Sequence, residues 1–397
     1  MRGKRKWGVA LTLLAGVTAV AALAASMGGS ATAGIQGPIV IGWAYDAKGQ
    51  MAPFDNPALA TARIRVRELN AKGGVNGRKV RLDTCDTQNN NPARAKSCAR
   101  QLLGQGAQII FTTCDVDFAT PVVQEAINRG KLAISTCIGT DQMGPKRFGA
   151  SKGRLAFSFG NVAQDEGSAM AEYAIRRGWR TAGTATNTLL VYFKNVIQAF
   201  EKRYQQLGGR IVARESYQTG ANNVQLAVTK LHAKSAKVYV TSTAFGELPA
   251  FVSGFRTLGN QTPILNSWAG DGTYWVTQSP KVTNYYAVTY ASVFGDDPNA
   301  KINRLGKQVK AATGGFVQGI GTIDGIVVAI KRAGGSTNGA VLSRTLENFK
   351  KVQTTNGKVS FSRNLHSVFG RQYRVIKVHN NKGTRVGFVT AKVVPKI

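Results

Sequence analysis

The sequence predicts an α/β fold built from two doubly wound parallel-sheet units. Short runs rich in Val and Ile alternate with longer segments of helical spacing, and no triplet or heptad repeat runs along the chain. With 397 residues, 43% of them apolar, the chain can form one large or two medium domains and is too apolar to be disordered. These features exclude collagen, coiled coils and multi-pass membrane proteins.

The first 33 residues have the features of an export signal. A basic stretch at 1–6 precedes an apolar run at 9–25 and a small-residue cleavage site at 31–33. We predict removal after Ala33, with an uncleaved anchor as the alternative, because the apolar run is slightly long for a signal. The first cysteine is Cys85, far beyond this run, so we expect no bacterial lipid anchor. The predicted location is the periplasm or the extracytoplasmic cell-envelope space.

Four apolar runs separated by three segments of helical spacing predict the first unit. The predicted strands are 39–43, 79–83, 108–112 and 131–135, and the predicted helices are 57–70, 92–104 and 119–129. Pro92 fits the first turn of its helix, where no backbone N–H is needed. Helical crossovers between consecutive strands require a parallel sheet with helices on both faces.

A second unit of the same kind begins near Phe157. Its predicted strands are 181–185, 210–214, 237–241 and 262–266, and its predicted helices are 165–177, 192–207, 222–233 and 247–258. From Tyr285 strands and helices alternate again, and the chain ends in polar β-like segments at 358–361 and 372–378. Two stacked α/β units result.

The charge is strongly basic and uneven. The formal charge is +32, which falls to +28 without the four basic residues of the leader. Residues 301–397 carry 18 Lys and Arg against two acids, an excess of +16. For an exported protein such a field favours an anionic envelope surface, unless it is simply a solvated basic surface. Nucleic-acid binding is not predicted, because no recognisable module or interleaved aromatics occur in the basic region.

Catalytic and cofactor motifs are missing. The sequence has no P-loop, no dinucleotide fingerprint and no H-E-x-x-H helix. A G-x-S-x-G match at 149–153 lacks the preceding strand and following helix that a nucleophile elbow requires. The carboxylate pairs Asp115/Asp117 and Asp296/Asp297 are expected to lack an apolar setting that would raise a pKa. We predict a protein that is not an enzyme and that needs no cofactor.

The cysteines predict two disulfides and no metal site. Cys85, Cys98, Cys114 and Cys137 fall within 53 residues of a chain predicted to be exported, where disulfides persist. Zinc would suit a C-x-x-C pair with nearby histidines. C-x-x-C is absent, and the three histidines, at 232, 366 and 379, lie far from this window.

Several stretches together resemble one known family. They are ELNAKGGVNGRKV at 68–80, CDTQ at 85–88, PVVQEA at 121–126, LAIS at 132–135, YQTGA at 217–221 and GKVSF at 357–361. In this order and spacing they are similar to the periplasmic leucine/isoleucine/valine-binding proteins, the type I solute receptors of ABC importers. The resemblance covers roughly residues 38–390, and the ordered set carries it, because no single motif is diagnostic.

The resemblance implies two α/β lobes joined by a three-segment hinge, with a ligand caught between them. We place the three chain crossings near 158–161, 288–292 and 361–364. The first lobe then comprises 38–158 and 291–361, and the second comprises 161–289 and 362–397.

In open parallel sheets, ligands bind outside the carboxyl ends of the strands, next to helix N-termini. The predicted ligand-binding residues are Tyr45, Asp115, Thr136, Thr140, Tyr192, Phe245 and Asp271. By resemblance, Thr136 and Thr140 would bind a ligand carboxylate and Asp271 its ammonium. Tyr192 and Phe245 would line the wall of the second lobe. The structural alternatives are turn-capping threonines, a turn-forming Asp271 and two core aromatics.

One departure from the family pattern bears on the ligand. The serine-rich turn expected after the third strand is replaced by the segment 114–117, Cys-Asp-Val-Asp. Acids there would repel a carboxylate, so the ligand could be cationic, amide-bearing or otherwise non-standard.

Two disulfide arrangements fit. Cys114 and Cys137 end neighbouring predicted strands, which leaves Cys85 to reach Cys98 on the following helix. The pairing better known in leucine-type receptors would instead join Cys85 to Cys114. We favour the first arrangement.

The sequence therefore predicts an exported substrate-binding component of an ABC importer. It would capture a small polar metabolite, such as an amino acid or a related amine or amide, and deliver it to a membrane permease. One alternative is a ligand-sensing receptor subunit that uses the same cleft. The other is a cationic protein that binds the cell envelope.

Overall fold

The computed structural model describes residues 37–218 and 220–397, so the predicted export signal lies outside the described residues. The strands are β1 (Ile39–Tyr45), β2 (Val80–Asp86), β3 (Ile109–Thr112), β4 (Leu132–Ser135), β5 (Ala156–Ser158), β6 (Thr181–Asn187), β7 (Arg210–Tyr217), β8 (Val238–Ser242), β9 (Ile264–Asn266), β10 (Tyr285–Thr289), β11 (Val352–Thr354), β12 (Gly357–Val359), β13 (Tyr373–His379) and β14 (Lys382–Val389). The α-helices are α1 (Ala52–Ala71), α2 (Pro92–Gly104), α3 (Val116–Asn128), α4 (Pro145–Phe148), α5 (Ala163–Arg176), α6 (Val191–Gln206), α7 (Ala221–His232), α8 (Glu247–Thr257), α9 (Ala300–Gln308), α10 (Phe316–Arg332) and α11 (Gly339–Glu347).

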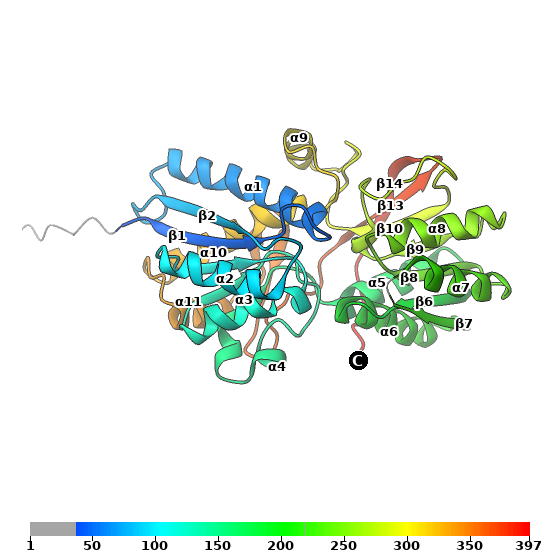
Figure 1. Cartoon of the computed structure of the whole chain (residues 1–397), viewed down its shortest axis with the longest axis horizontal. Helices are drawn as coiled ribbons and strands as arrows, with labels where there is room; N and C mark the ends of the chain where they lie inside the picture. Colours follow the sequence, from blue (N-terminus) through cyan, green and yellow to red (C-terminus); the bar gives the residue numbers. More distant parts are fainter. Residues whose placement is uncertain (1–36, 219) are drawn as a thin grey trace, which may run out of the picture. The chain divides into compact units, whose positions relative to one another are not determined.

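The first sheet has five parallel strands in the order β2-β1-β3-β4-β5 (Figure 1). Its strands alternate their side chains between two cores. Ile41 and Trp43 of β1 pack with α1, α10 and α11, whereas Val40 packs with α2 and α3 on the opposite face. The predicted crossovers therefore cover both faces of this sheet.

The second sheet has seven strands in the order β14-β13-β10-β9-β8-β6-β7. The strands β6 to β10 are parallel, whereas β13 pairs antiparallel with β10 and β14. The helices α5 and α6 cover one face, where Val238 and Val240 are buried, and α7 and α8 cover the other, where Tyr239 is buried. The predicted α/β class with parallel-sheet lobes is confirmed, and β14 is a strand that the sequence analysis did not predict.

Two segments between the sheets run side by side. Ser158 N donates to His366 O at 2.8 Å, and Val368 N donates to Gly160 O at 2.9 Å. The end of β10 lies next to them, because Asn161 N donates to the Tyr290 hydroxyl at 3.3 Å. The third connecting segment pairs at 366–368, slightly beyond the predicted crossing at 361–364. The exact lobe boundaries stay a prediction.

The helices α1 and α3 begin several residues earlier than predicted, for local reasons. The helix α1 begins at Ala52 with Pro53 in its first turn, so Pro57 lies inside the helix rather than at its start. The carbonyl that Pro57 leaves without a helical partner, Pro53 O, accepts a hydrogen bond from Thr313 at 3.3 Å. The helix α3 begins at Val116 because Asp115 caps it.

No helix among residues 37–218 and 220–397 is long and apolar enough to cross a membrane.

Candidate functional site

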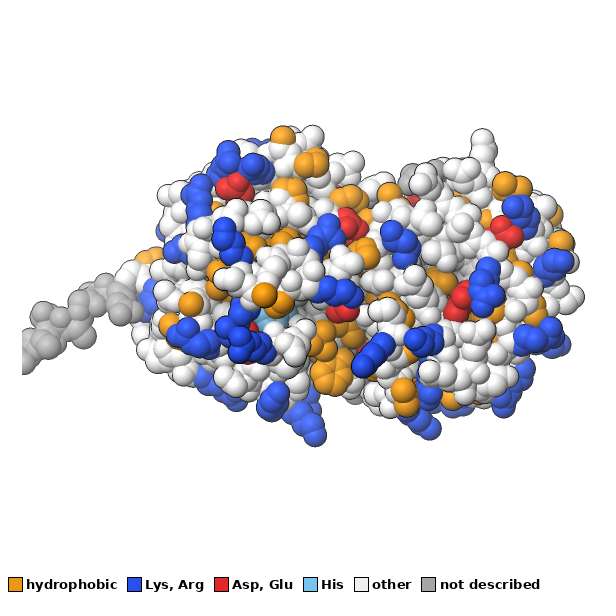
Figure 2. All heavy atoms as spheres, turned by 90° about the horizontal axis from the view of Figure 1, so that it is seen from below, with side chains coloured by type: hydrophobic (Ala, Val, Ile, Leu, Met, Phe, Trp, Pro, Cys, Tyr) orange, Lys and Arg blue, Asp and Glu red, His pale blue; other side chains and the backbone are white. Residues whose placement is uncertain are grey.

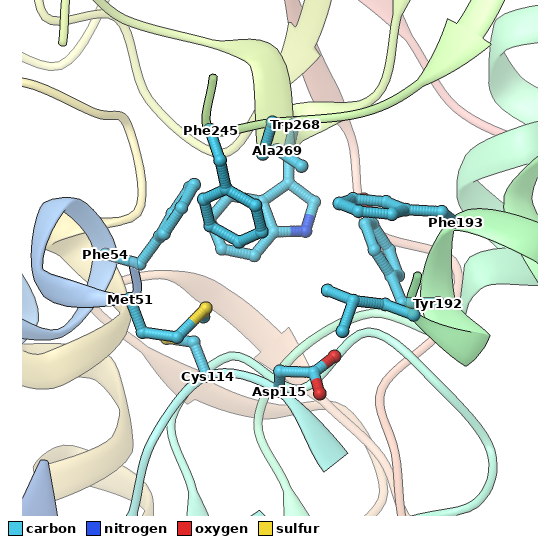
Figure 3. A pocket seen from close by; sticks show the side chains of 11 residues that line it. Met51, Phe54, Cys114, Asp115, Tyr192, Phe193, Phe245, Trp268 and Ala269 are labelled. Carbon is cyan, nitrogen blue, oxygen red and sulfur yellow. The ribbon is translucent and has the colours of Figure 1, made fainter. Parts of the chain in front are cut away.

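A cavity lies where strands of both sheets end at their carboxyl edges (Figure 3). Four lining residues, Met51, Phe54, Cys114 and Asp115, follow β1 and β3, and we call them the first-sheet wall. Seven others, Leu190, Tyr192, Phe193, Ala244, Phe245, Trp268 and Ala269, follow β6, β8 and β9, and we call them the second-sheet wall. The structure thus brings the predicted residues Asp115, Tyr192 and Phe245 together at one cavity.

Aromatic side chains of the two walls contact each other. The ring of Phe54 meets Trp268 edge-on at a centroid distance of 5.1 Å and Phe245 at 6.4 Å. Figure 3 shows the indole of Trp268 pointing into the ring of side chains that surround the cavity. The free volume left is about 20 Å³, which is room for about one water molecule. A ligand as large as an amino acid therefore enters only after the walls move apart.

Asp115 is the charged residue of the cavity lining. Its Oδ1 accepts hydrogen bonds from the backbone N–H groups of Asp117 at 2.8 Å and Phe118 at 3.3 Å, at the start of α3. Burial and the charge of Asp117 raise the pKa of Asp115 to about 7, although the helix amides and Arg147 lower it. The expectation that the Asp115/Asp117 pair lacks an apolar setting is therefore wrong, because the aromatic walls and the core beneath β3 exclude water from Asp115.

A second buried carboxylate, Glu166 of α5, lies behind the second-sheet wall. Its Oε2 accepts the Tyr192 hydroxyl hydrogen bond at 2.8 Å, and its Oε1 accepts one from Trp268 N at 2.6 Å. Burial raises the pKa of Glu166 to about 8 against these two hydrogen bonds, which lower it. Glu166 therefore fixes two residues of the cavity without lining it.

Asp271 lies away from the cavity lining, at the junction between β10 and α10. It accepts hydrogen bonds from the Thr289 hydroxyl and from Gly314 N, the latter at 2.7 Å. Burial raises the pKa of Asp271 to about 7. In this structure the side chain binds the segment that leaves the second sheet rather than facing the cavity.

Three further predicted residues are also outside the lining. Thr136 is buried beside the disulfide, with its hydroxyl 2.8 Å from Cys137 Sγ. The Thr140 hydroxyl contacts Asn195 Oδ1 at 3.4 Å. Tyr45, the last residue of β1, packs against the core of the first sheet. Their proposed contacts with a ligand stay predictions.

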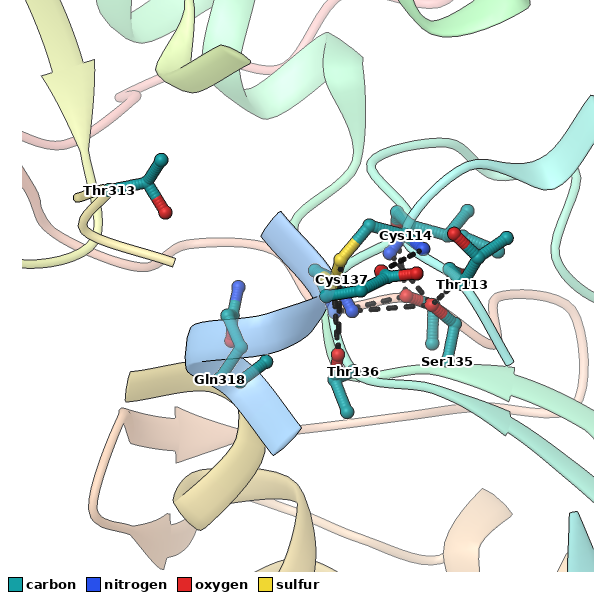
Figure 4. The surroundings of a disulfide bond; sticks show 12 residues. Thr113, Cys114, Ser135, Thr136, Cys137, Thr313 and Gln318 are labelled. Atoms are coloured by element: carbon teal, nitrogen blue, oxygen red, sulfur yellow. Dashed lines mark hydrogen bonds between the residues drawn. A yellow bond between two sulfur atoms is a disulfide. The ribbon is translucent and has the colours of Figure 1, made fainter. Parts of the chain in front are cut away.

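The structure contains the favoured disulfide arrangement. Cys85 is bonded to Cys98, with 5.5 Å between their Cα atoms, and Cys114 is bonded to Cys137, with 5.0 Å. Figure 4 shows the second bond between the ends of β3 and β4, next to Thr136. Since Cys114 lines the cavity, this disulfide fixes the first-sheet wall at the position of Asp115. No cluster of His, Cys, Asp or Glu in the described ranges could hold a metal ion.

Sequence reasoning missed several members of the lining. Phe54 was not singled out because the helix containing it was predicted to start at Pro57, three residues later. Trp268 lies two residues after the predicted strand 262–266, where an aromatic ring suits packing as well as ligand binding. Phe193 directly follows the predicted Tyr192. Two adjacent aromatic residues at the start of a helix were the sequence feature that could have identified it. Glu166 gave no signal, because an acid in the first turn of a helix is common.

Comparison with known proteins shows a family match over most of the chain. The family model described as "Periplasmic binding protein" matches residues 38–384. The chain is 23% identical over 330 residues to Leu/Ile/Val-binding protein homolog 3 of Brucella melitensis, which covers 82% of this chain and 87% of that relative. It is 20% identical over 331 residues to Leu/Ile/Val-binding protein BraC3 of Rhizobium johnstonii, with 81% and 87% covered.

Solved structures show the same fold. The branched-chain amino acid transporter substrate-binding protein LivJ of Streptococcus pneumoniae, solved with isoleucine, has a TM-score of 0.76 at 21% identity and covers 90% of this chain and 100% of its own. An ABC transporter solute-binding protein of R. palustris, solved with benzoate, has a TM-score of 0.74 at 15% identity, with 90% and 98% covered.

Proposed function

Because the chain belongs to the periplasmic binding protein family, we propose that it is the exported substrate-binding component of an ABC importer. The family and the small-molecule-binding role predicted from the sequence are confirmed at the level of the family. The observation that supports a site in this chain is the cavity itself, whose two walls come from two sheets joined by separate connecting segments. Closure of such lobes around a ligand would supply the signal that a permease reads.

The proposal is binding without chemical conversion. Asp115 and Tyr192 are the lining residues with ionisable side chains. Asp115 caps a helix, the Tyr192 hydroxyl donates to Glu166, and Cys114 is bonded in a disulfide. No nucleophile and base are paired among the lining residues, which suits capture and release.

The relatives suggest the size of the ligand. LivJ of Streptococcus pneumoniae was solved with isoleucine and the R. palustris protein with benzoate, both small molecules with an apolar body. We propose a ligand of similar size for this chain, because its walls offer apolar and aromatic surface to such a body.

Thermal unfolding of ligand-free protein tests the proposal. The protein is unfolded and refolded to remove bound molecules, checked by native mass spectrometry, and then screened against amino acids, amines, amides and aromatic acids. A ligand that binds the folded state raises the melting temperature. The response should weaken in Phe245→Ala, which opens the second-sheet wall, and persist in Phe369→Ala, which removes an exposed side chain. No response from any compound class would contradict the proposed function.

Export is part of the proposal and has a separate test. The periplasmic family supports an extracytoplasmic location, and the predicted signal at 1–33 would direct it there. Intact mass of the protein recovered outside the cytoplasm should correspond to a chain that begins after Ala33. A chain that retains its first residues would favour the uncleaved anchor.

A basic surface groove supports an anionic envelope surface as a second partner. Lys152, Arg154, Arg344 and Arg363 line a groove of about 540 Å³ next to α11. Glu347 is the acid that pairs there, with its Oε1 2.8 Å from Arg154 Nε. Figure 2 shows Lys and Arg side chains spread over one face, with few acids among them. Retention on anionic vesicles that falls with added salt and with Arg344→Glu would support this contact.

A further inference from the structure

Carboxylates of the protein already occupy the backbone donors around the cleft cavity. Free backbone N–H groups at helix N-termini are the usual anion sites of this architecture. At the start of α3, the N–H groups of Asp117 and Phe118 donate to Asp115. At the start of α6, Val191 N donates to Asp117 Oδ2 at 3.0 Å. Both helix N-termini that face each other across the cleft are therefore occupied by acids of the first-sheet side.

Backbone donors at the strand ends are used in the same way. Cys114 N, which follows β3, donates to Asp55 Oδ1 at 3.1 Å. Trp268 N, which follows β9, donates to Glu166 Oε1. An incoming carboxylate would have to displace these buried protein carboxylates from their donors, which leaves them unpaired at a high cost.

Cations that could balance a carboxylate are also committed elsewhere. None of the eleven lining residues is Lys, Arg or His. Arg147, the basic residue that acts on Asp115, bonds to Asp117 Oδ1 at 2.9 Å and to Gln142 at 3.0 Å. Arg371 is buried near the hinge, where it donates to Phe159 O at 3.1 Å. The lining therefore offers no cation to a ligand carboxylate, although the whole chain is strongly basic.

Aromatic faces around one acid make a site for an organic cation. Phe54, Phe193, Phe245, Trp268 and Tyr192 surround the space beside Asp115 (Figure 3). Aromatic faces attract ammonium groups, and the attraction grows when water is excluded. Both helix amides bond to Asp115 Oδ1, which leaves Oδ2 for a ligand. Trp268 Nε1 has no partner among the described residues, so the site also offers one neutral donor to a hydroxyl or carbonyl oxygen.

We propose that the cleft takes an organic ammonium ion with a small apolar body and no carboxylate, with Asp115 as its counter-charge. The inference rests on the proposed function and narrows its substrate class. The proposed ligand differs from those of the two solved proteins described above, because isoleucine and benzoate each carry a carboxylate.

Matched series of compounds separate the charge from the apolar body. Leucine, 3-methylbutylamine and 4-methylpentanoate share one skeleton as zwitterion, cation and anion. Phenylalanine, 2-phenylethylamine and 3-phenylpropanoate form an aromatic series, and choline with glycine betaine forms a quaternary pair. By calorimetry on ligand-free protein, we expect at least one amine or choline to bind at least tenfold more tightly than its carboxylate partners.

The charge of Asp115 is tested by Asp115→Asn, which keeps the helix cap, because Asn caps as well as Asp. We expect at least a tenfold loss of affinity for the amine that binds, with the affinity for the neutral analogue 3-methylbutanol or 2-phenylethanol unchanged. Asp83→Asn, the same change on β2 away from the cavity, should leave both affinities as they are. Binding of the neutral analogue also shows that the variant is folded.

The outcomes distinguish the inference from the function. Tighter binding of a zwitterion or an anion than of its amine would overturn the inference and leave the receptor function intact. An amine affinity that is equal in Asp115→Asn would also overturn it. Binding of no compound in the series or in the broad panel would remove the inference and the proposed function together.

Discussion

The two walls of the cleft cavity place their acids differently. In the first-sheet wall, Asp115 faces the cavity from a turn that a disulfide fixes at its neighbour Cys114. In the second-sheet wall, Glu166 lies behind the aromatic surface and holds Tyr192 and Trp268 from the rear. One carboxylate is therefore available to a ligand, and the other serves the protein.

The two acids therefore have different expected roles: Asp115 influences which ligand charge is bound, and Glu166 stabilises the second-sheet wall. A ligand in the proposed site would change the solvation and charge balance of Asp115, because Asp115 lines that cavity. Glu166 is screened from the ligand by the rings that it positions, so its ionisation acts on stability instead. Substitutions in the first-sheet wall should therefore alter which charge is bound, and those behind the second-sheet wall should alter how stability responds to pH.

The largest effect is expected from the disulfides. Removing Cys114–Cys137 or Cys85–Cys98 by double Ala substitution should each lower the free energy of unfolding by about 3 kcal/mol, because the reduced chain regains loop entropy. The first of these variants should also weaken ligand binding, since it releases the turn that carries Asp115. Chemical denaturation and calorimetry measure the two effects.

The variant without the Cys85–Cys98 disulfide is the control for this prediction. This disulfide joins β2 to α2, and neither cysteine lines the cavity. A loss of ligand affinity of the same size in both variants would show that the turn at Cys114 has no special role in the first-sheet wall.

Glu166→Gln should change the pH dependence of stability. Burial raises the pKa of Glu166 to about 8, so between its ordinary value and pH 8 the folded state binds a proton that the unfolded state lacks. Stability from this group is present at low pH and is lost as the pH rises towards 8. Gln does not titrate, so the variant should gain roughly 2 kcal/mol relative to the wild type between pH 6 and pH 8.

Thermal unfolding of both proteins across this range gives the measurement. Asp55, Asp115 and Asp271 also have raised pKa values, but they are the same in both proteins and cancel in the difference. Glu68→Gln, the same change on a half-exposed side chain of α1 far from Glu166, is the matched control for the substitution itself. A Glu166→Gln difference that shrinks as the pH rises would contradict the assignment.

The sequence predicted the location of this site, at the carboxyl ends of the strands, better than it predicted the full set of residues that line the cavity. Tyr192, Phe245 and Asp115 were found because parallel strands end at one edge and their following residues can be counted along the chain. Phe54 was missed because proline usually marks the first turn of a helix, and here Pro57 is accommodated inside α1 by the Thr313 hydroxyl. That contact joins segments far apart in the sequence, so no local pattern predicts it.

The hydrogen-bond partners of the buried acids could not be predicted from the sequence either. Asp271 was assigned to a ligand ammonium by resemblance, yet the structure directs it to Gly314 N at the start of the segment that leads into α10. Glu166 could not be assigned, because its two partners are brought to it by β9 and α6. Which way a carboxylate faces depends on such tertiary contacts rather than on its position after a strand.

Phe54→Ala should weaken the contact between the walls. Phe54 meets three rings of the second-sheet side, those of Phe245, Trp268 and Tyr274. Phe54 also lines the cavity. An aromatic side chain packed on a ligand contributes about 0.5–1.5 kcal/mol beyond its burial, so the loss of this ring from the first-sheet wall should weaken ligand affinity roughly tenfold. Phe54→Leu, which keeps apolar bulk but no ring, should lie between the variant and the wild type in calorimetry. Equal affinity in all three proteins would show that the ring of Phe54 makes no contact with the ligand.

The smallest expected effect is the pH dependence of ligand binding, which depends on Asp115, the carboxylate of the cavity lining. Burial raises its pKa to about 7, and the charged groups that act on it are Asp117 on α3 and Arg147 on α4. The titratable group on the opposite wall is Tyr192, whose raised pKa keeps its hydroxyl neutral. A primary amine stays protonated between pH 6 and pH 8, whereas Asp115 becomes ionised over that range.

Amine affinity should therefore rise by up to about tenfold from pH 6 to pH 8, because a cation gains a charged partner only where Asp115 is ionised. Calorimetry with 3-methylbutylamine or 2-phenylethylamine, whichever binds, measures the change. The matching alcohol should show no such rise, and neither should the amine with Asp115→Asn. An amine affinity that instead increases as the pH falls would contradict this prediction, because no carboxylate gains negative charge on acidification. Asp115 would then not be the counter-charge, and the first-sheet wall would have no distinct role in selecting the ligand's charge.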